Sequence, residues 1–510
     1  MGPLARLPLS IVMLCILAVG SASAATYYVA TSGSDSNNGS SKTTPWQHAP
    51  GMNGCSAVCA STAPVAGDSI ILRGGDTWNH SNLTWTWTWS GAAGNRIYVG
   101  VDETWYTGAS FVRPKLDAEF LCCASGLMSI SSAGHITIDD LEFTGLMMNY
   151  PGNSPSLGIL TYNGDIFMTR LYVHNWNRCT GAGAPTPYCT GAVTDNSWFA
   201  GGIQGAAWAN GPTMANVIVD HSDVGNPENG SNIGSALHNI EQANYSYIHD
   251  AGSGCKEGCR IVHDSHFDNI GATFDGVTHE DVIYSHLFGA GSTASTFLAY
   301  IYNNLVTNTA GNATCCSIYP NPGDSGATSS VTYWIFNNVV YGSQVQFGND
   351  VDPYNMPSGL NTTIHDWNNT YVATFGGAEC VRVTPRSTPP ITNMDVQNLH
   401  CISPNNTTPV DFGGMVTNPS TNNIVGQTVG TATTQGYVSG NNYAPTGATS
   451  ATVGAGVNLT AQCSGILAAL CIGLDGNPRP SSGAWDVGAY EYTSGQGLPA
   501  APTGLAAIVQ

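Results

Sequence analysis

One short pattern decides the fold, in VIVDHSDV (residues 217–224), EQANYSYI (241–248), RIVHDSHF (260–267) and DVIYSHLF (281–288). Each stretch has an apolar residue, two variable residues, a serine, one more variable residue and another apolar residue. The marker serines are 24, 19 and 20 residues apart: Ser222, Ser246, Ser265 and Ser285. Short runs of this kind at a fixed spacing are typical of β-strands in a repeat protein.

The pattern continues on both sides, with other residues at the marker position. Leucine takes it before the serines and asparagine after them: Leu141, Leu171, Asn304, Asn338, Asn369 and Asn398. Ser285 to Asn304 is again 19 residues, the outer intervals are 29 to 34, and one is 51. About 20 residues with three short strands make one turn of a parallel β-helix, and longer intervals are turns with inserted loops. We predict this all-β solenoid, with the markers stacked in one line and the asparagines bonded along it. The alternative is a β-sandwich with coincidental spacing.

Composition restricts the partners. The chain has 13 Lys and Arg against 33 Asp and Glu, a net charge of −20, which repels nucleic acid and anionic membranes. Its 61 glycines disfavour a helical protein, and 42% hydrophobic residues are enough to form a core. We expect no nucleic acid as partner, and a monomer.

The first 24 residues have the features of an export signal. Arg6 gives a positive start, Ile11–Val19 is a short apolar run, and Ala22-Ser23-Ala24 fits a cleavage site. No other apolar segment is long enough to span a membrane. We therefore expect a secreted protein.

The cysteines agree with export. After Cys15 leaves with the signal, 14 remain, mostly as near neighbours, which favours disulfides in an oxidising compartment. The favoured bonds are Cys179–Cys189, Cys255–Cys259 and Cys380–Cys401, the last because 21 residues correspond to one turn. The pairing of four adjacent cysteines stays open: Cys122, Cys123, Cys315 and Cys316.

Both ends resemble known proteins. TYYVATSGSDSNNGSS (26–41) and AGDSIILRGGDTW (66–78) resemble the opening of secreted bacterial right-handed β-helix proteins of the pectate-lyase-like superfamily. DGNPRPSSGAWDVGAYEY (475–492) resembles their closing segment. The resemblance implies a right-handed helix with an N-terminal cap and an irregular C-terminal segment. It does not specify an activity, because the superfamily includes lyases, hydrolases, epimerases and non-catalytic surface proteins.

We expect five segments along the chain. They are a signal peptide (1–24), an N-terminal cap with the first coils (25–120), the β-helix core (121–403), C-terminal coils with a closing segment (404–492), and a linker or tail (493–510).

Ionisable residues gather between residues 216 and 290. Five residues before the marker stand Glu241, Arg260 and Glu280, which predicts an arginine between two carboxylates on successive coils. Strand parity points this column inward, so either a turn intervenes or the ladder is a buried structural salt bridge. Lys256 and Arg260 are the only basic residues between Arg178 and Arg382. We expect the side chains of Lys256 and His266 at the surface.

Two further columns are predicted to face outward together. One residue after the marker stand Asp223, Tyr247, His266 and His286, and three after it stand His249 and Asp268. Imidazoles beside carboxylates on a rigid sheet can act as acids and bases, bind a metal or contact a sugar. The alternative is a solvated polar face.

Calcium is the one cofactor that the sequence suggests. VIVDHS (217–222) resembles a pectate-lyase strand in which the aspartate helps to bind calcium, which implies a weak calcium ligand at Asp220. The loop GSDSNNG (33–39) has calcium-like spacing but no clear closing glutamate. A plain turn rich in Asp and Asn is the better interpretation of that loop.

Two functions remain open. The first is a carbohydrate-active enzyme, a polysaccharide lyase or glycoside hydrolase, with an extracellular polysaccharide as its partner. Its candidate catalytic residues are Lys256, Arg260, His266, His286, Asp268, Glu241 and Glu280. The sugar contacts would be His249, Asp223 and Tyr247. A hydrolase needs two carboxylates, for which the chain also offers Asp264 and Asp281. The second is a non-catalytic surface or carbohydrate-binding protein with an aromatic platform of Trp85, Trp87, Trp89 and Trp105, residues that an amphipathic cap strand would also explain.

Overall fold

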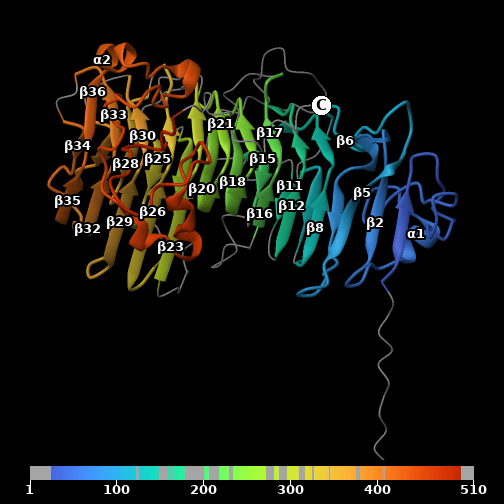
Figure 1. Ribbon diagram of the computed structural model, residues 1–510. Coiled ribbons are helices and arrows are strands. Elements are labelled where there is room, and N and C mark those ends of the chain that lie inside the picture. Colours follow the sequence, from blue (N-terminus) through green and yellow to red (C-terminus); the bar gives the residue numbers. More distant parts are fainter. Residues whose placement is uncertain are drawn as a thin grey trace, which may run out of the picture.

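The computed structural model describes residues 24–121, 126–131, 133–148, 159–161, 165–178, 200–205, 217–228, 234–271, 281–286, 296–308, 316–323, 327–343, 345–374, 379–405 and 408–494. Nearly all of its regular structure is β, and neighbouring strands pair in parallel. Figure 1 shows the strands stacked side by side along one long axis, from blue to orange. This is a right-handed parallel β-helix, as the repeat and the resemblance predict.

Each full turn contributes one strand to each of three faces, which we call face 1, face 2 and face 3. Face 1 contains β4 (Trp85–Trp87), β7 (Met128–Ile130), β11 (Ile159–Thr161), β15 (Ala200–Gln204), the first halves of β18 (Ser235–Asn244) and β20 (Ser253–His263), β22 (Ile283–Ser285), β25 (Cys316–Pro320), β28 (Phe347–Val351), β31 (Val381–Val383) and β34 (Val410–Asp411). Face 2 contains β1 (Thr26–Val29), β2 (Ser69–Gly74), β5 (Ile97–Tyr106), β8 (Ile136–Asp139), β12 (Ile166–Thr169), β16 (Val217–Asp220), the second halves of β18 and β20, β23 (Thr296–Tyr302), β26 (Ser330–Phe336), β29 (Asn361–Trp367), β32 (Ile391–Gln397) and β35 (Val416–Asn422).

Face 3 is a separate 12-stranded sheet. It contains β3 (Thr77–Trp78), β6 (Lys115–Asp117), β9 (Glu142–Thr144), β13 (Tyr172–Val173), β17 (Asp223–Gly225), β19 (Tyr247–His249), β21 (His266–Asp268), β24 (Leu305–Thr307), β27 (Val339–Val340), β30 (Thr370–Val372), β33 (His400–Ser403) and β36 (Val425–Thr428). A small extra sheet pairs β10 (Met147–Met148) with β14 (Asn177–Arg178). Helices are short: α1 (Ala57–Ser61), α2 (Val429–Thr434) and 3₁₀ turns at His80–Asn82, Ser439–Asn441, Thr460–Gln462 and Gly465–Cys471. None of the described helices is long and apolar enough to cross a bilayer.

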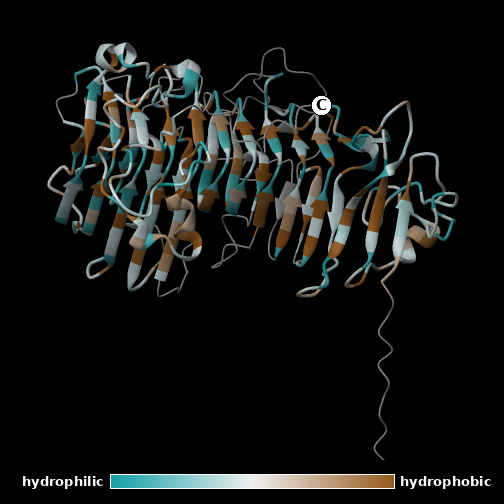
Figure 2. Cartoon of the chain, viewed as in Figure 1, coloured by the Kyte–Doolittle hydropathy of each residue, from teal (hydrophilic) through white to brown (hydrophobic). Residues whose placement is uncertain are grey.

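The core runs through the middle of the solenoid. Alternate residues of each strand point inward, so apolar side chains stack from turn to turn, and Figure 2 shows this alternation as bands along the strands. On face 2, for example, Val219, Ala243 and Val262 are in register and fully buried. The parallel pairing begins at β1 and ends at β36.

The marker line forms, with two corrections. The Ser222 N–H donates to Ser246 Oγ and the Ser246 N–H to Ser265 Oγ, both at 3.2 Å. The Ser265 N–H donates to Asn304 Oδ1, also at 3.2 Å, so the predicted Ser285 is skipped. Ser285 instead ends β22 on face 1, because the full turn after Ser265 is 39 residues long and reaches Asn304. The 20-residue spacing between Ser265 and Ser285 was therefore a coincidence.

The asparagine ladder is confirmed over three rungs. Asn304 Nδ2 donates to Asn338 Oδ1 at 3.0 Å, and Asn338 Nδ2 donates to Asn369 Oδ1 at 3.1 Å. The fourth predicted rung is wrong by one residue. The register of β29 with β32 aligns Leu399 with Asn369, and Asn398 stands at the corner beside the line.

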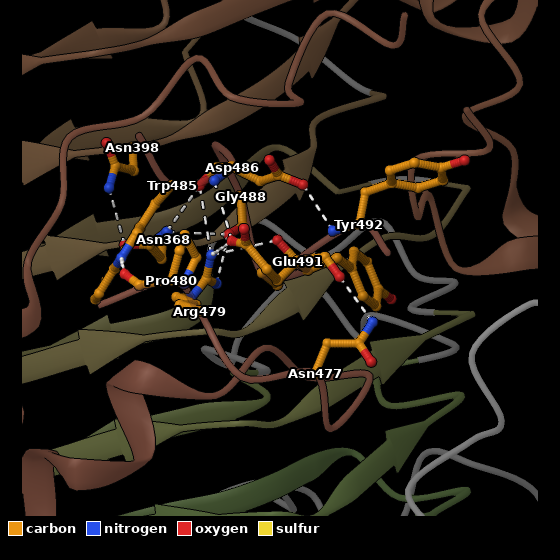
Figure 3. A network of polar contacts seen from close by, with 12 residues as sticks. Asn368, Asn398, Asn477, Arg479, Pro480, Trp485, Asp486, Gly488, Glu491 and Tyr492 are labelled. Atoms are coloured by element: carbon orange, nitrogen blue, oxygen red, sulfur yellow. Dashed lines mark hydrogen bonds and ion pairs between the residues drawn. The ribbon is translucent and has the colours of Figure 1, made fainter. Parts of the chain in front are cut away.

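Residues 429–494 form a C-terminal segment, here called the strap, that folds back over the last turns. Asn368 Nδ2 donates to the Asp486 and Gly488 carbonyls at 3.2 and 3.3 Å. The buried Arg479 donates to Glu491 at 3.1 Å and to the Gly488 carbonyl at 3.0 Å, as Figure 3 shows. The closing segment that resembles other β-helix proteins therefore fastens the strap to the outside of the solenoid.

The cysteine and tryptophan predictions are settled in part. Bonds Cys255–Cys259 and Cys380–Cys401 are present, together with Cys55–Cys59 and Cys463–Cys471. Cys179, Cys189, Cys122, Cys123 and Cys315 lie outside the described residues. Trp85 and Trp87 are fully buried in the core, so the amphipathic cap strand is correct and the aromatic platform is wrong.

Candidate active site

Long connections surround face 1. The corner from face 2 to face 3 takes only two residues, as between Asp220 and Asp223 or between His263 and His266. In several coils the chain reaches face 1 and leaves it through much longer segments, such as residues 179–199 before β15 and residues 205–216 after it, whereas in β18 and β20 it passes from face 1 to face 2 within one strand. Functional side chains are found disproportionately where a rigid sheet meets long connections. Face 1 is therefore the first place to look for a site.

The outward column of face 1 is polar and buried. The strand register aligns His238 with Lys256 and Lys256 with Tyr284, and Glu257, Asp281 and His286 lie beside this column. The exposed fractions are 2% for His238, 1% for Glu257, and 0% for Lys256, Asp281 and His286. Ionisable side chains are almost never so fully buried unless they are paired or functional.

His238 and Glu257 form an oriented pair. Nε2 of His238 lies 3.2 Å from Oε2 of Glu257, and Nδ1 of His238 is buried with no hydrogen-bond partner among the described residues. A carboxylate only accepts hydrogen bonds, so the hydrogen of a neutral His238 is on Nε2. Nδ1 then carries the lone pair, which is the arrangement of a general base held in place by a carboxylate.

Glu257 stays ionised in spite of its burial. Burial raises the pKa of this carboxyl, but the charge of His238, the hydrogen bond from it, and the charges of His286 and Lys256 outweigh burial and lower the pKa. Glu257 sits at the corner of face 1 and face 2 with φ of 57°, a left-handed conformation that is sparsely populated for glutamate. Backbone strain of this kind is concentrated at functional sites.

Aromatic rings continue the column. The Tyr284 ring lies 4.1 Å from the His286 ring and 4.9 Å from the Tyr319 ring, between centroids. The Gly258 N–H donates to the His286 carbonyl at 2.7 Å, which holds β20 against β22. The phenol of Tyr284 accepts from Asn321 Nδ2 at 3.4 Å.

The far end of the column is bound in ion pairs. Tyr319 donates to Asp352 at 2.5 Å, and Arg386 Nε donates to the same carboxylate at 2.7 Å. Arg382 binds Asp350, whose pKa is raised because burial outweighs the arginine. These residues are saturated, and we assign them a positioning role.

The predicted site residues fall on three different faces. Lys256 and His286 are on face 1 and are buried, whereas both were expected at the surface. His286 therefore does not join the column of Asp223, Tyr247 and His266, because Leu305 takes that place in the register.

Five of the predicted residues do come together on face 3. His249 Nε2 is 2.8 Å from Asp223 and Nδ1 is 2.7 Å from Asp250, and Tyr247 stacks on the His249 ring at 4.1 Å. Tyr247 also donates to Asp268 at 3.4 Å, and His266 contacts the Thr307 hydroxyl at 2.7 Å. Burial lowers the pKa of His249, but the hydrogen bonds and charges of its two carboxylates outweigh burial and raise it.

The predicted ladder around Arg260 is half confirmed. Arg260 binds Glu241, and Arg260 NH1 donates to the Leu298 carbonyl at 2.9 Å. The side chains are 28% and 13% exposed and point outward, because the corner between face 1 and face 2 intervenes. A fully buried salt bridge is therefore wrong. Glu280 lies outside the described residues.

The calcium prediction gains no support from the coordinates. Asp220 accepts from Thr169 at 3.1 Å, contacts His221 at 2.8 Å and binds Asn244, so its oxygens are already used. Asp35, in the calcium-like loop, accepts from the N–H groups of Gln47 and His48 as in a plain turn. The described residues contain no cluster of three or more His, Cys, Asp or Glu able to hold a metal.

Sequence reasoning missed His238 and Glu257. Each of them lies further before its marker serine than the repeated pattern extends. In addition, the chain turns a corner of the solenoid between each residue and its marker serine. One feature of the sequence could have pointed to this site, because His238 and Lys256 are 18 residues apart in neighbouring coils. Aligning the coils on the marker serines does not show, however, which face the two residues share.

Comparisons with known proteins find only distant structural likenesses. A rhamnogalacturonan lyase is 13% identical, over 74% of this chain and 87% of that one, with a TM-score of 0.39. Pectate lyase Pel9A is 16% identical over 93% and 98%, with a TM-score of 0.39. The GH136 lacto-N-biosidase from Eubacterium ramulus is 11% identical over 78% and 68%, with a TM-score of 0.38. No family model and no curated protein matches the chain. At such low values the likeness says nothing about activity, which has to be argued from the side chains.

Proposed function

We propose that the protein is a polysaccharide lyase that cleaves a uronate-containing chain at face 1. The observation that carries the proposal is the buried His238, held by Glu257 through Nε2 and in register with Lys256. A base with an open nitrogen beside a cation is what β-elimination next to a carboxylate requires.

The roles follow from the chemistry. Nδ1 of His238 takes the proton from the carbon beside the uronate carboxyl group, and the Lys256 ammonium offsets the carboxylate charge. The bond from the neighbouring carbon to the glycosidic oxygen breaks, a carbon–carbon double bond forms, and a proton passes to the leaving oxygen. His286 is the proposed acid for that proton, and Glu257 is a positioning residue that fixes the His238 tautomer.

The cluster on face 1 is less negative than the chain as a whole. The chain as a whole carries a net charge of −20, which disfavours polyanions. Within the cluster, with His238 neutral as the base, Lys256 and a protonated His286 balance Glu257 and Asp281, so Lys256 meets the substrate carboxylate in a site without net negative charge.

A glycoside hydrolase is the second candidate. Two buried carboxyl groups, Glu257 and Asp281, lie near one cluster, and hydrolysis uses a carboxyl pair. The two reactions give different products, because only elimination creates an unsaturated sugar.

The test uses a panel of polysaccharides, read by the ultraviolet absorbance of unsaturated uronate and by new reducing ends. We expect absorbance from a polyuronate, and a loss of about 10²- to 10⁴-fold in kcat for His238→Ala. The matched control is His249→Ala on face 3, another buried histidine paired with carboxylates, which should keep activity within about threefold.

Other outcomes are equally decisive. Reducing ends without absorbance would support the hydrolase, and no product from any polymer would support a non-catalytic binding protein. If the His238 and His249 variants lose activity equally, the site is not on face 1. Glu257→Gln should lower kcat and change the shape of its pH profile, which a purely structural role would not do.

We also propose that the protein acts outside the cell. Four disulfides in the described part of the chain support this, since such bonds persist in oxidising compartments. Detection of the protein in culture medium, with its N-terminus near Ala25, would test both the export and the predicted signal peptide.

A further inference from the structure

One residue in each turn makes the corner between face 2 and face 3 in a left-handed conformation. Its φ lies between 42° and 55° in Asp140, Arg170, His221, Tyr245, Asp264, Asn303, Asn337, Asn368, Asn398 and Asn423. Asparagine and aspartate tolerate this conformation, whereas bulky side chains are strained in it. Asparagine would fit the positions of His221 and Tyr245 with less strain. The presence of these two rings therefore calls for an explanation.

The last four asparagines of the column, from Asn337 on, bind the strap. Asn337 Nδ2 donates to the Ile472 carbonyl at 2.8 Å, and Asn398 Nδ2 donates to the Val457 carbonyl at 2.9 Å. Asn368 binds the strap in the same way, as Figure 3 shows. At the C-terminal end of the solenoid, the corner residues therefore bind a segment of chain, the strap, that runs along the outside.

A column of rings runs beside the corner and continues past the strap. Trp367, Phe336 and Tyr302 pack with strap residues such as Leu470 and Trp485. Tyr302 stacks on the His263 ring at 4.8 Å with the planes 6° apart. Among the described residues, the contacts between the strap and this column therefore end at Tyr302. The column of rings continues beyond Tyr302 toward the N-terminal turns, starting with His263.

The next rings are open to solvent. Tyr245 contacts His263 edge-on at 5.5 Å and stacks on His221 at 4.9 Å with the planes 19° apart. Tyr245 is 37% exposed, and the side chain of His221 is 45% exposed. Two strained residues thus present a flat ring surface at the positions where later turns, from Asn337 on, present asparagine to the strap.

Carboxylates border this surface. His221 Nδ1 is 2.8 Å from Asp220, and His263 Nδ1 is 2.8 Å from Asp264. Asp264 also accepts from Asn303 Nδ2 at 3.1 Å. Flat rings flanked by acceptors suit a ligand with apolar C–H faces and many hydroxyl donors. The negative border disfavours a polyanion.

We propose that His221, Tyr245 and His263 form a second, non-catalytic binding surface for a neutral polysaccharide chain. The sugar rings lie on Tyr245 and His221, and their hydroxyls donate to Asp264, whose side chain is 25% exposed. The surface is on the corner of face 2, away from the buried cluster of face 1, so it does not depend on the proposed lyase activity.

Affinity gel electrophoresis tests this proposal with galactan, xylan, glucomannan or polygalacturonate cast in the gel. The test variant is the double substitution His221→Asn and Tyr245→Asn, which installs the residue that the later turns use and so preserves the fold. We expect retardation of the wild type by at least one neutral polymer, and a loss of at least about tenfold in the variant. The variant's melting temperature should stay equal or rise, because the strain is relieved.

The matched control is Tyr354→Asn, which removes another exposed tyrosine from a different part of the molecule. It should leave retardation unchanged. The proposal is overturned if no neutral polymer retards the wild type, if only polygalacturonate does, or if the double variant is retarded equally. It is also overturned if size-exclusion chromatography shows a wild-type dimer that the double variant loses, because the rings would then hold a second copy.

Discussion

Replacing Asp366 with asparagine should stabilise the protein at neutral pH and remove part of its pH dependence. Asp366 is fully buried in the core of β29, in register with Ile335 of β26 and Val396 of β32. Its carboxyl group accepts from Asn349 at 2.6 Å, from Asn369 at 2.8 Å and from Tyr371 at 3.2 Å. These three bonds are too few to offset the loss of water.

The magnitude follows from the pKa. Burial raises the pKa of Asp366 from 3.8 to about 6, against the hydrogen bonds that lower it. Between these two values the native state binds more protons than the unfolded state, so stability falls as the pH rises from about 4 to about 6. A shift of about two pH units corresponds to about 3 kcal/mol at pH 7. The asparagine side chain does not titrate, so the variant lacks this contribution to the pH dependence.

Asparagine has nearly the same shape as aspartate but carries no charge. Asn349 has an amide oxygen with no hydrogen-bond partner among the described residues, so turning its amide lets it accept from the new side chain. Urea unfolding of both proteins at pH 4, 5, 6 and 8 is the assay. The variant should match the wild type near pH 4 and exceed it by up to about 3 kcal/mol at pH 8. A difference that is the same at every pH, or a variant that is less stable at pH 8, would refute the reasoning.

Three further predictions concern stability. Replacing both Cys380 and Cys401 with serine should cost about 3 kcal/mol in urea unfolding, because the bond closes a 21-residue loop; no loss would mean that the bond does not constrain the unfolded chain. Arg479→Met should lower the free energy of unfolding by about 3–5 kcal/mol, because it leaves Glu491 as an uncompensated buried acid. It should also make the strap accessible to limited proteolysis, and an unchanged cleavage pattern would contradict this. Asn338→Leu should cost about 1–3 kcal/mol, because it leaves the Asn304 N–H and the Ile301 carbonyl without their side-chain partner, and an equal melting temperature would argue against the ladder.

The sequence alone was sufficient for the architecture. In a solenoid each turn packs on its neighbours, so the core appears in the chain as a repeated local pattern. Leu141, Ser222 and Asn338 could be aligned without knowing any distant contact. Disulfides between near neighbours, such as Cys255–Cys259, were accessible for the same reason.

The turn lengths were not determined by the sequence pattern. The 20 residues from Ser265 to Ser285 looked like one coil, yet they end on face 1, and the full turn ends at Asn304. Loops carry no strict period, so spacing cannot show how many faces a segment has crossed. This one error placed His286 with His266, although the two side chains lie on different faces.

Only the tertiary structure decided which ionisable residues share a site. Corners at Asn239 and Glu257 rotate the chain between face 1 and face 2, so Lys256 and Arg260, four residues apart, belong to different faces. The same corners bring His238 beside Glu257, two residues that no pattern in the chain connects. The sequence determined the stacking because that depends on local alternation, and the fold decided the chemistry because that depends on which side of each corner a side chain lies.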